Sequence, residues 1–242
     1  MESWRLITTW GAAPGFNMGL DEALLESFES PPTLRFYTWR PDTLSLGYFQ
    51  RFADVAGTDR AGAVVRRITG GGAIHHVHEL TFSITASLDD PVYRGPVAES
   101  YARVHEAIRA ALAEIGVPAQ ARGARDLVSD REGTGMCFHK SSAEDLVWGS
   151  RKGVGSAQRR KAGRVLHHGS IKLGASALEG EIATAAEHRP GLSPEEFAPL
   201  LARAIQAHFA IALEPAVPSP SERSEAKLLG ARYLDPEFLR RR

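Results

Sequence analysis

Residues 66–83 read RRITGGGAIHHVHELTFS, and this run holds the strongest structural signals in the chain. The segment Ala63–Ile68 is apolar and β-branched, so it predicts a strand that ends at three consecutive glycines. From Glu79 to Leu88, apolar and polar residues alternate, which predicts a second strand. The glycines therefore connect two strands.

The three glycines, Gly70, Gly71 and Gly72, allow the backbone to approach a ligand closely and to point N–H groups at an anion or a polarised carbonyl. Arg66 and Arg67, just upstream, could hold a carboxylate or a phosphate. Neither Gly-x-x-x-x-Gly-Lys nor a helix-opening Gly-x-Gly-x-x-Gly occurs, so the two common phosphate-binding loops are not indicated. Taken alone, the glycines fit a simple turn equally well.

Similar patterns on both sides of this run predict further elements. Alternating or β-branched segments predict strands at Trp4–Trp10, Thr33–Trp39, Thr43–Phe49, Glu144–Trp148, Lys152–Gln158 and Arg164–Lys172. Between the first two, a helix is expected with Asn17 as its cap and with Asp21 and Glu22 in its first turn. Apolar residues at three- and four-residue steps predict a long helix over Val97–Ile115.

The last fifty residues carry two helix-start signals. Ser193 and Ser219 each open a capping box, with a proline at the first helical position and a glutamate two residues after that proline. Together with the preceding patterns, these signals predict a mixed α+β core followed by a small helical C-terminal tail.

The composition limits the class of protein. The chain has 242 residues, of which 43% are hydrophobic and 24% charged, as in soluble globular proteins. The formal net charge is zero, which argues against binding nucleic acid by bulk electrostatics. No apolar run is long enough for a membrane span, and the first residues lack the layout of a signal peptide. We therefore predict a cytoplasmic protein with no nucleic-acid or membrane partner.

A second notable segment, residues 151–158, reads RKGVGSAQ. Lys152 begins a predicted strand lined by glycine, serine and alanine, so an extended acyl chain or a nucleotide could lie along it. The lysine could donate hydrogen bonds to a carbonyl or phosphate oxygen. Without further support, the same pattern also fits a surface strand with a solvated lysine.

Cys137 is the only cysteine, so no internal disulfide is possible and a reducing compartment is expected. A lone cysteine is most often a small buried apolar residue. Here it follows the glycine-rich segment GTGM at 133–136, and His139 and Lys140 follow within three residues. Because basic neighbours favour the thiolate, Cys137 is also a candidate nucleophile.

The histidines do not predict a metal site. His75, His76 and His78 lie close together, and His167 and His168 are adjacent on a predicted strand. Adjacent residues on a strand point to opposite faces, and a zinc site would need a suitable spacing and a second cluster of ligands.

Taken together, these motifs resemble the signature of the biotin/lipoate protein ligase and octanoyltransferase superfamily. The matching segments are RRITGGGAIHH at 66–76 with ELTFS at 79–83, GSRKGVGSAQ at 149–158, and HGSI at 168–171. The opening NMGLDEAL at 17–24 is similar to the family's first helix. The motifs follow the family order from residue 17 to residue 171, and the last fifty residues resemble the family's short helical tail.

The resemblance implies an α+β fold related to biotin synthetases and class II aminoacyl-tRNA synthetases, with a mixed, mainly antiparallel sheet flanked by helices. It implies a catalytic core over residues 1–190 and a helical tail over residues 191–242 packed on that core. It also implies that Lys152 reaches the acyl carbonyl, while the glycine-rich loop and its arginine line the acyl site. The substrate-binding residues expected from the resemblance are Arg67, Gly70, Gly71, Gly72, Ala73, His76, Gly155, Ser156, Ala157, His168 and Gly169.

Two chemistries share this fold. Lipoate–protein ligases activate free lipoate with ATP and pass it from the adenylate to a lysine of a lipoyl domain. Cysteine-dependent octanoyltransferases of the LipM type take octanoate from acyl carrier protein through an enzyme thioester. Their nucleophile stands in a Cys-Phe motif fifteen residues before the motif lysine, and Cys137-Phe138 stands at that offset from Lys152.

The chain departs from the transferase pattern at two places. After Cys137-Phe138 the transferases tend to have Pro-Ser and then Tyr-Glu, whereas this chain reads HKSSAE at 139–144. An acidic residue often follows the motif histidine, and Val77 stands there instead. Both departures bear on the acyl donor and leave the nucleophile and the lysine in place.

The sequence therefore favours an octanoyltransferase in which Cys137 and Lys152 are catalytic. Octanoyl acyl carrier protein is the expected donor, and a lipoyl domain or a glycine-cleavage H-type protein is the expected acceptor. No cofactor is expected for this reaction. One alternative is a lipoate–protein ligase that uses Lys152 without Cys137 and needs ATP and Mg²⁺. Another is a non-catalytic accessory subunit that binds an acyl group or an adenylate.

Overall fold

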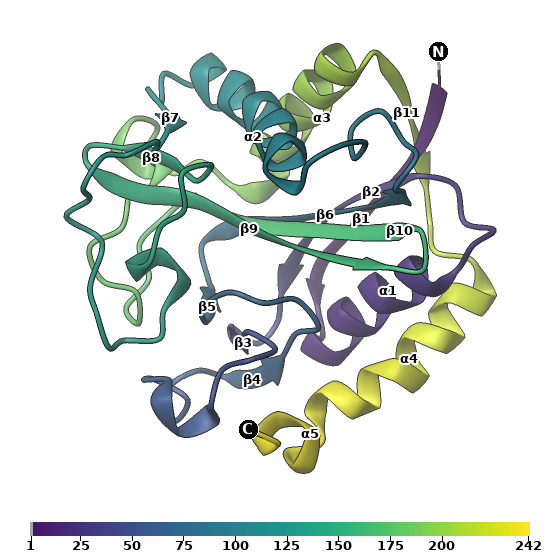
Figure 1. The fold of residues 1–242 in the computed structure, drawn as a ribbon, viewed down its shortest axis with the longest axis horizontal. Helices are drawn as coiled ribbons and strands as arrows, with labels where there is room; N and C mark the ends of the chain where they lie inside the picture. Colours follow the sequence, from purple (N-terminus) through teal and green to yellow (C-terminus); the bar gives the residue numbers. More distant parts are fainter. Residues whose placement is uncertain (1) are drawn as a thin grey trace.

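A large mixed sheet forms the centre of the molecule (Figure 1). The structure is a computed structural model that describes residues 2–242, and in them eight strands pair in the order β11-β1-β2-β6-β10-β9-β8-β7. Their bounds are β1 Glu2–Ala12, β2 Thr33–Trp39, β6 Glu79–Ser87, β7 Gln120–Ala121, β8 Leu146–Trp148, β9 Arg151–Lys161, β10 Arg164–Lys172 and β11 Ile211–Ala216. Strand β1 runs parallel to β2 and β11, while the other pairs are antiparallel. The expected mixed, mainly antiparallel α+β fold is confirmed.

A second, three-stranded sheet holds the glycine-rich loop. It consists of β3 (Thr43–Leu46), β4 (Ala63–Arg66) and β5 (Ile74–His76), with β3 in the middle. Strand β4 enters the loop and β5 leaves it, so this small sheet fixes both ends of the glycine run. The sequence predicted the first two of these strands, but not β5 and not their separation from the large sheet.

Helices cover both faces of the large sheet. Helices α2 (Val97–Glu114) and α3 (Pro194–Phe209) lie on one face, and α1 (Pro14–Glu26) and α4 (Pro220–Leu234) lie on the other; the short α5 (Pro236–Arg240) follows α4 (Figure 1). No helix in residues 2–242 is both long and apolar enough to cross a bilayer.

Strand β2 explains how both faces of the sheet become core. Phe36 belongs to the cluster that packs under α2 and α3, whereas its neighbour Tyr37 belongs to the cluster that contains Met18 of α1. This alternation follows from the two-residue period of a strand. Because strand β2 is paired with β1 and β6 and covered on both sides, its side chains are almost completely buried.

The structure corrects the predicted start of α1. The helix begins at Pro14 with Ala13 as its N-cap, so Asn17 lies inside the first turns and is not a cap. Proline suits this position because it has no N–H to leave unsatisfied. Asn17 is buried, and its Nδ2 donates to the carbonyl oxygen of Thr38 at 3.1 Å. Asp21 is likewise buried inside the helix, where it forms an ion pair with Arg35.

The segment after residue 190 contains the two predicted helices and two elements that the sequence did not reveal, β11 and the short helix α5. Ser193 accepts from the backbone N–H of Glu196, and Ser219 accepts from that of Glu222, so both capping boxes are confirmed. Between the helices, β11 adds in parallel to the edge of β1. Its sequence, IALEPA, contains a proline and is short, which explains why its pattern is weak.

Candidate active site

The loop that carries Cys137 lies against the glycine-rich loop. The backbone N–H of Cys137 donates to the carbonyl oxygen of Ala73 at 2.7 Å, and the N–H of Ala73 donates to that of Gly135 at 2.8 Å. The contact requires a glycine at position 72, because a Cβ there would lie 2.6 Å from the Cys137 nitrogen. The two motifs, about sixty residues apart in the sequence, therefore form one surface.

Lys152 reaches Cys137 from strand β9. Its Nζ lies 3.5 Å from the Cys137 Sγ and donates to the carbonyl oxygen of Cys137 at 3.0 Å and of Lys140 at 3.3 Å. It also forms an ion pair with Asp145 at 2.8 Å. The lysine is only 2% exposed, so the idea of a solvated surface lysine is wrong.

The surroundings keep Lys152 charged. Burial by itself lowers the pKa of the ammonium, but the negative charges of Cys137 and Asp145 and their hydrogen bonds outweigh burial and leave the pKa raised. Lys152 is therefore a cation at neutral pH and cannot act there as a base. A cation at this distance from Sγ can stabilise negative charge that develops at the sulfur during a reaction.

Asp145 is the residue of this site that the sequence did not reveal. Its side chain is buried, and besides pairing with Lys152 it accepts from the backbone N–H of Ser142 at 2.7 Å. A carboxylate directly before the apolar run LVW at 146–148 could have indicated a buried acidic residue. A buried charge needs a partner, so it could also have indicated an ion pair. The sequence could not name that partner without the pairing of β8 with β9.

The basic residues that follow Cys137 in the sequence do not supply the nearby cation. The ring of His139 is held by the Thr134 hydroxyl at 2.8 Å and by the carbonyl oxygen of Glu179 at 2.5 Å. Lys140 contributes its carbonyl oxygen to Lys152. The cation near the Cys137 sulfur is instead Lys152, which is fifteen residues away in the sequence and adjacent in the fold.

The glycine at position 155 makes room for this pair. A Cβ on Gly155 would lie 2.7 Å from Cε and 2.9 Å from Nζ of Lys152, and 3.4 Å from the Cys137 Sγ. Gly155 therefore leaves space that the Lys152 side chain occupies. This is the physical reason for a glycine at position 155 of the GVGSAQ segment.

A small, mostly apolar cavity opens next to Cys137. It is lined by Met18, Tyr37, Trp39, Ser45, Arg67, Gly71, Ile74, His76, Thr81, Cys137, Ser156, Ala157, His168 and Gly169. A wider, more polar cleft lies beside it, and Lys152 and Gly72 are among its lining residues. Cys137, Gly71 and Ser156 line both spaces, so the sulfur stands at their junction.

The structure brings most of the expected substrate-binding residues together. Seven of them line the cavity: Arg67, Gly71, His76, Ser156, Ala157, His168 and Gly169. Gly72 lines the cleft, whereas Gly70, Ala73 and Gly155 are not among the residues that line either space. Ala73 and Gly155 instead pack directly against the Cys137–Lys152 pair.

Arg67 holds the glycine-rich loop in shape. Its guanidinium is buried and donates to the carbonyl oxygens of Gly70 and Gly72, each at 2.7 Å, and to that of Ser45 at 2.9 Å. Burial lowers the pKa of Arg67 to about 10, so the group stays charged at neutral pH. Gly71 has a φ of +90°, a conformation that glycine adopts far more easily than other residues.

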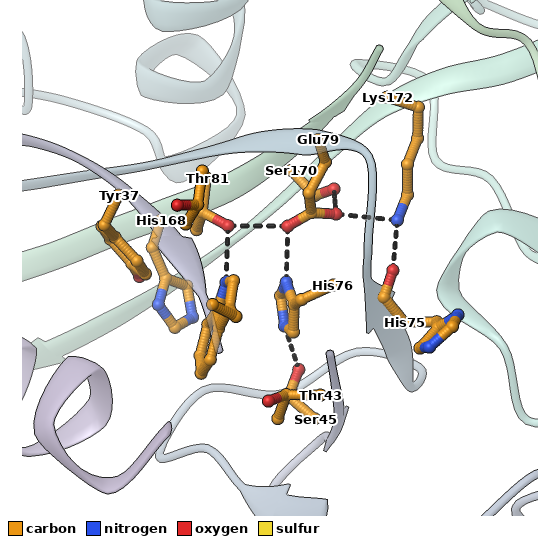
Figure 2. A network of polar contacts seen from close by, with 12 residues as sticks. Tyr37, Thr43, Ser45, His75, His76, Glu79, Thr81, His168, Ser170 and Lys172 are labelled. Carbon is orange, nitrogen blue, oxygen red and sulfur yellow. Dashed lines mark hydrogen bonds and ion pairs between the residues drawn. The ribbon is translucent and has the colours of Figure 1, made fainter. Parts of the chain in front are cut away.

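Buried carboxylates fix the two cavity histidines, Glu79 in the case of His76 (Figure 2) and Asp21 in the case of His168. His76 Nδ1 donates to Glu79 at 2.5 Å, and its Nε2 accepts from the Ser45 hydroxyl at 2.7 Å. Burial lowers the pKa of His76 even though Glu79 opposes this effect, so the ring is neutral. Glu79 in turn pairs with Lys172 at 2.7 Å.

His168 is held in the same manner on β10. Its Nε2 lies 2.7 Å from the Thr69 hydroxyl and its Nδ1 lies 3.2 Å from Asp21. Strand pairing places His168 opposite Ala157 of β9, which explains why both line the cavity. No group of three or more His, Cys, Asp or Glu side chains suited to a metal ion occurs in residues 2–242.

The contact between the glycine loop and the cysteine loop gives a first prediction. Gly72→Ala should lower the free energy of unfolding by roughly 1–3 kcal/mol, because the new methyl group meets backbone atoms. It should also slow acylation of Cys137 by about 10–100-fold, since the sulfur would be displaced. Melting curves and an acylation time course measure both effects.

Gly70→Ala is the matched control for this experiment. A Cβ on Gly70 would meet only the Phe49 ring, at an ordinary 3.7 Å. We expect a melting temperature close to that of the unmodified protein and a much smaller loss of acylation. Equal effects of the two substitutions would show that the contact with Cys137 is not what requires Gly72.

Comparisons with known proteins identify the family. The family model for the lipoyl protein ligase A/B catalytic domain matches residues 13–184. An octanoyltransferase LipM from Moorella thermoacetica is 43% identical over 179 residues, covering 71% of this chain and 66% of that protein. The octanoyltransferase LipM from Kyrpidia tusciae is 34% identical over 272 residues, covering 98% of both chains.

Solved structures agree on the fold. A lipoate-protein ligase A bound with ATP has a TM-score of 0.79 at 24% identity, covering 99% of both chains. A bi-partite lipoate protein ligase from Thermoplasma acidophilum has a TM-score of 0.79 at 20% identity, covering 99% of this chain and 97% of that chain. At these identities the likeness concerns the fold alone. The chain therefore belongs to the lipoyl protein ligase A/B family, with octanoyltransferases of the LipM type among its relatives.

Proposed function

We propose that this protein is an octanoyltransferase that moves an octanoyl group from octanoyl acyl carrier protein to a lysine of a lipoyl domain or a glycine-cleavage H-type protein, through a thioester on Cys137. One observation carries the proposal: the Cys137 sulfur stands where an apolar cavity meets an open cleft, 3.5 Å from a buried ammonium. The names of the relatives, octanoyltransferases LipM, support the same acyl group.

In the first half of the proposed reaction, Cys137 becomes acylated. The octanoyl chain enters the apolar cavity, and its thioester carbonyl stops at the mouth. The Cys137 thiolate attacks the carbonyl carbon, a new carbon–sulfur bond forms, and the bond to the carrier's sulfur breaks. The carrier leaves as a thiolate that takes up the proton given up by Cys137.

In the second half, the amino group of the acceptor lysine attacks the thioester from the cleft. A carbon–nitrogen bond forms and the bond to Sγ breaks. The amine loses one proton, and the Cys137 thiolate that is released takes up one proton. Because both halves exchange a thioester for a bond of equal or greater stability, the reaction needs no ATP. No cofactor enters either half, whereas ATP and Mg²⁺ would belong to a ligase reaction.

Lys152 stabilises charge in both halves. Its ammonium can favour the attacking thiolate and can then donate to the oxygen on which negative charge develops in the tetrahedral intermediate. Asp145 is a positioning residue for Lys152, because its carboxylate holds Nζ at 2.8 Å. The raised pKa of Lys152 is consistent with an electrostatic role and not with that of a base.

The test of this function is a transfer assay without ATP. Octanoyl acyl carrier protein, an unmodified lipoyl domain and the enzyme are mixed, and octanoylated lysine is measured by mass spectrometry. We expect modification of the lysine without ATP and no stimulation by added ATP and Mg²⁺. Modification that occurs only from free octanoate or lipoate with ATP and Mg²⁺ would establish the ligase alternative instead.

A further inference from the structure

A second hollow, separate from the acyl cavity, lies between α1, the α4–α5 segment and the end of β9. It has a volume of about 180 Å³, and Tyr48, Arg159, Lys161, Arg232 and Arg241 are among its lining residues. Neither Cys137 nor Lys152 lines it. The reaction described above therefore gives this hollow no role.

The hollow carries an excess of positive charge. Of its four cationic side chains, Arg232 pairs with Glu22 at 2.6 Å and Lys161 pairs with Glu26 at 2.5 Å. Arg159 and Arg241 have no carboxylate within ion-pair distance anywhere in residues 2–242. The protein has zero formal net charge, so this local excess is not a property of the whole surface.

The two unpaired arginines converge on Tyr48. The guanidinium carbon of Arg241 lies 3.9 Å from the centre of the Tyr48 ring, and that of Arg159 lies 5.4 Å from it. The pKa of the Tyr48 phenol is lowered, first by a hydrogen bond from Arg241 and then by the charges of Arg241, Arg159 and Arg242. A negative group placed here is thus favoured by its surroundings.

The cationic side chains sit on anchored backbone. The buried Arg66 donates through Nε and Nη2 to the carbonyl oxygen of Leu239, at 3.0 and 2.7 Å, two residues before Arg241. Arg159 donates to the carbonyl oxygen of Ile68 at 3.2 Å. The backbone just before Arg241 and the guanidinium of Arg159 are therefore held in place before a ligand arrives, which reduces the entropic cost of binding.

Three consecutive residues connect the hollow to the active-site cleft. Tyr48 lines the hollow, Gln50 lines the cleft, and the exposed ring of the intervening residue, Phe49, lies near Gly70. The backbone N–H of Tyr48 also donates to the carbonyl oxygen of Thr69, at the start of the glycine loop, at 2.8 Å. Two residue steps span at most about 7 Å, so a residue that lines the hollow and a residue that lines the cleft lie close together in the backbone.

We propose that Arg159 and Arg241 bind the phosphodiester of the phosphopantetheine arm that carries the acyl group. This inference rests on the proposed function, in which the donor thioester lies at Cys137. The pantetheine chain would cross Phe49 and leave its phosphate in the second hollow. Guanidinium groups suit this ligand because their planar forks donate paired hydrogen bonds to phosphate oxygens.

The test compares two small acyl donors that differ only in the phosphate. Acylation of Cys137 is timed by intact mass with octanoyl-pantetheine and with octanoyl-4′-phosphopantetheine, both below saturation. We expect the unmodified protein to react at least about tenfold faster with the phosphorylated donor. In Arg159→Gln, in Arg241→Gln and in the double variant, the ratio of the two rates should fall towards one.

A control variant removes an arginine elsewhere. Arg203 lies on α3, on the opposite face of the sheet, and pairs with Glu114 at 3.1 Å (Figure 1). Arg203→Gln should keep the ratio of the unmodified protein. Equal rates for the two donors in the unmodified protein, or an unchanged ratio in the double variant, would overturn the proposal.

Two further outcomes separate this proposal from others. If neither donor acylates Cys137, the proposed octanoyltransferase function fails, and the phosphate site fails with it. If the donors react equally while ATP binds the unmodified protein and binds the double variant more weakly, the hollow serves a nucleotide phosphate. That result would contradict the arm as ligand while leaving thioester formation intact.

Discussion

Cys137→Ser should abolish ATP-independent transfer of octanoate to a lipoyl domain, with a loss on the order of a thousandfold or more. A serine hydroxyl is not ionised near neutral pH and would need a base to take its proton. Lys152, whose Nζ lies 3.5 Å from Sγ, has a raised pKa, is paired with Asp145 and cannot serve as that base. Octanoylated lysine measured by mass spectrometry gives the rate.

The same variant also tests whether the effect is chemical. Serine is close to cysteine in size, and the backbone N–H of residue 137 still donates to Ala73, so we expect a melting temperature near that of the unmodified protein. Transfer that continues at a tenth of the original rate or faster would mean that Cys137 is only a buried small residue. A folded but inactive variant supports the nucleophile.

Lys152→Met should slow acylation of Cys137 by at least about tenfold, because it removes the preorganised cation that lies 3.5 Å from the sulfur. It should also lower the free energy of unfolding by about 3–5 kcal/mol, since Asp145 would remain buried without its partner. The intact mass of samples quenched at successive times gives the rate of acylation, and denaturant titration gives the free energy of unfolding.

The double variant Lys152→Met/Asp145→Asn separates these two effects. It removes both charges together, so most of the lost stability should return while acylation stays slow. Recovery of the rate along with the stability would show that Lys152 acts only by holding the fold. If Lys152→Met alone is acylated as fast as the unmodified protein, Lys152 has no role in acylation.

Local sequence patterns predicted those helices and strands in which buried side chains recur at the period of the element. The alternation in Glu79–Ser87 and the helical spacing in Val97–Glu114 each reflect one face packed on the core, and both elements occur within one or two residues of their expected bounds. The start of α1 was wrong because Asn17, a good capping residue, is used instead as a buried donor to Thr38. Capping propensity alone cannot distinguish these uses.

The candidate site was predictable only in part, for a similar reason. The pairing of Cys137 with Lys152 was inferred from the fifteen-residue spacing in the family motif. In the structure, Lys152 Nζ lies 3.5 Å from Cys137 Sγ. Asp145 and the ordering role of Arg67 depend on which strands and loops become neighbours, and no local pattern contains that information. The role of each residue in catalysis remains a prediction for the variants described above.

The most direct measurement of the central claim is the intact mass of the protein after mixing with octanoyl acyl carrier protein in the absence of ATP. A thioester on Cys137 predicts the addition of one octanoyl group, its removal by hydroxylamine, and no adduct in Cys137→Ser. An adduct that forms only with ATP and a free fatty acid or lipoate, or one that persists in Cys137→Ser, would contradict acyl transfer through this cysteine.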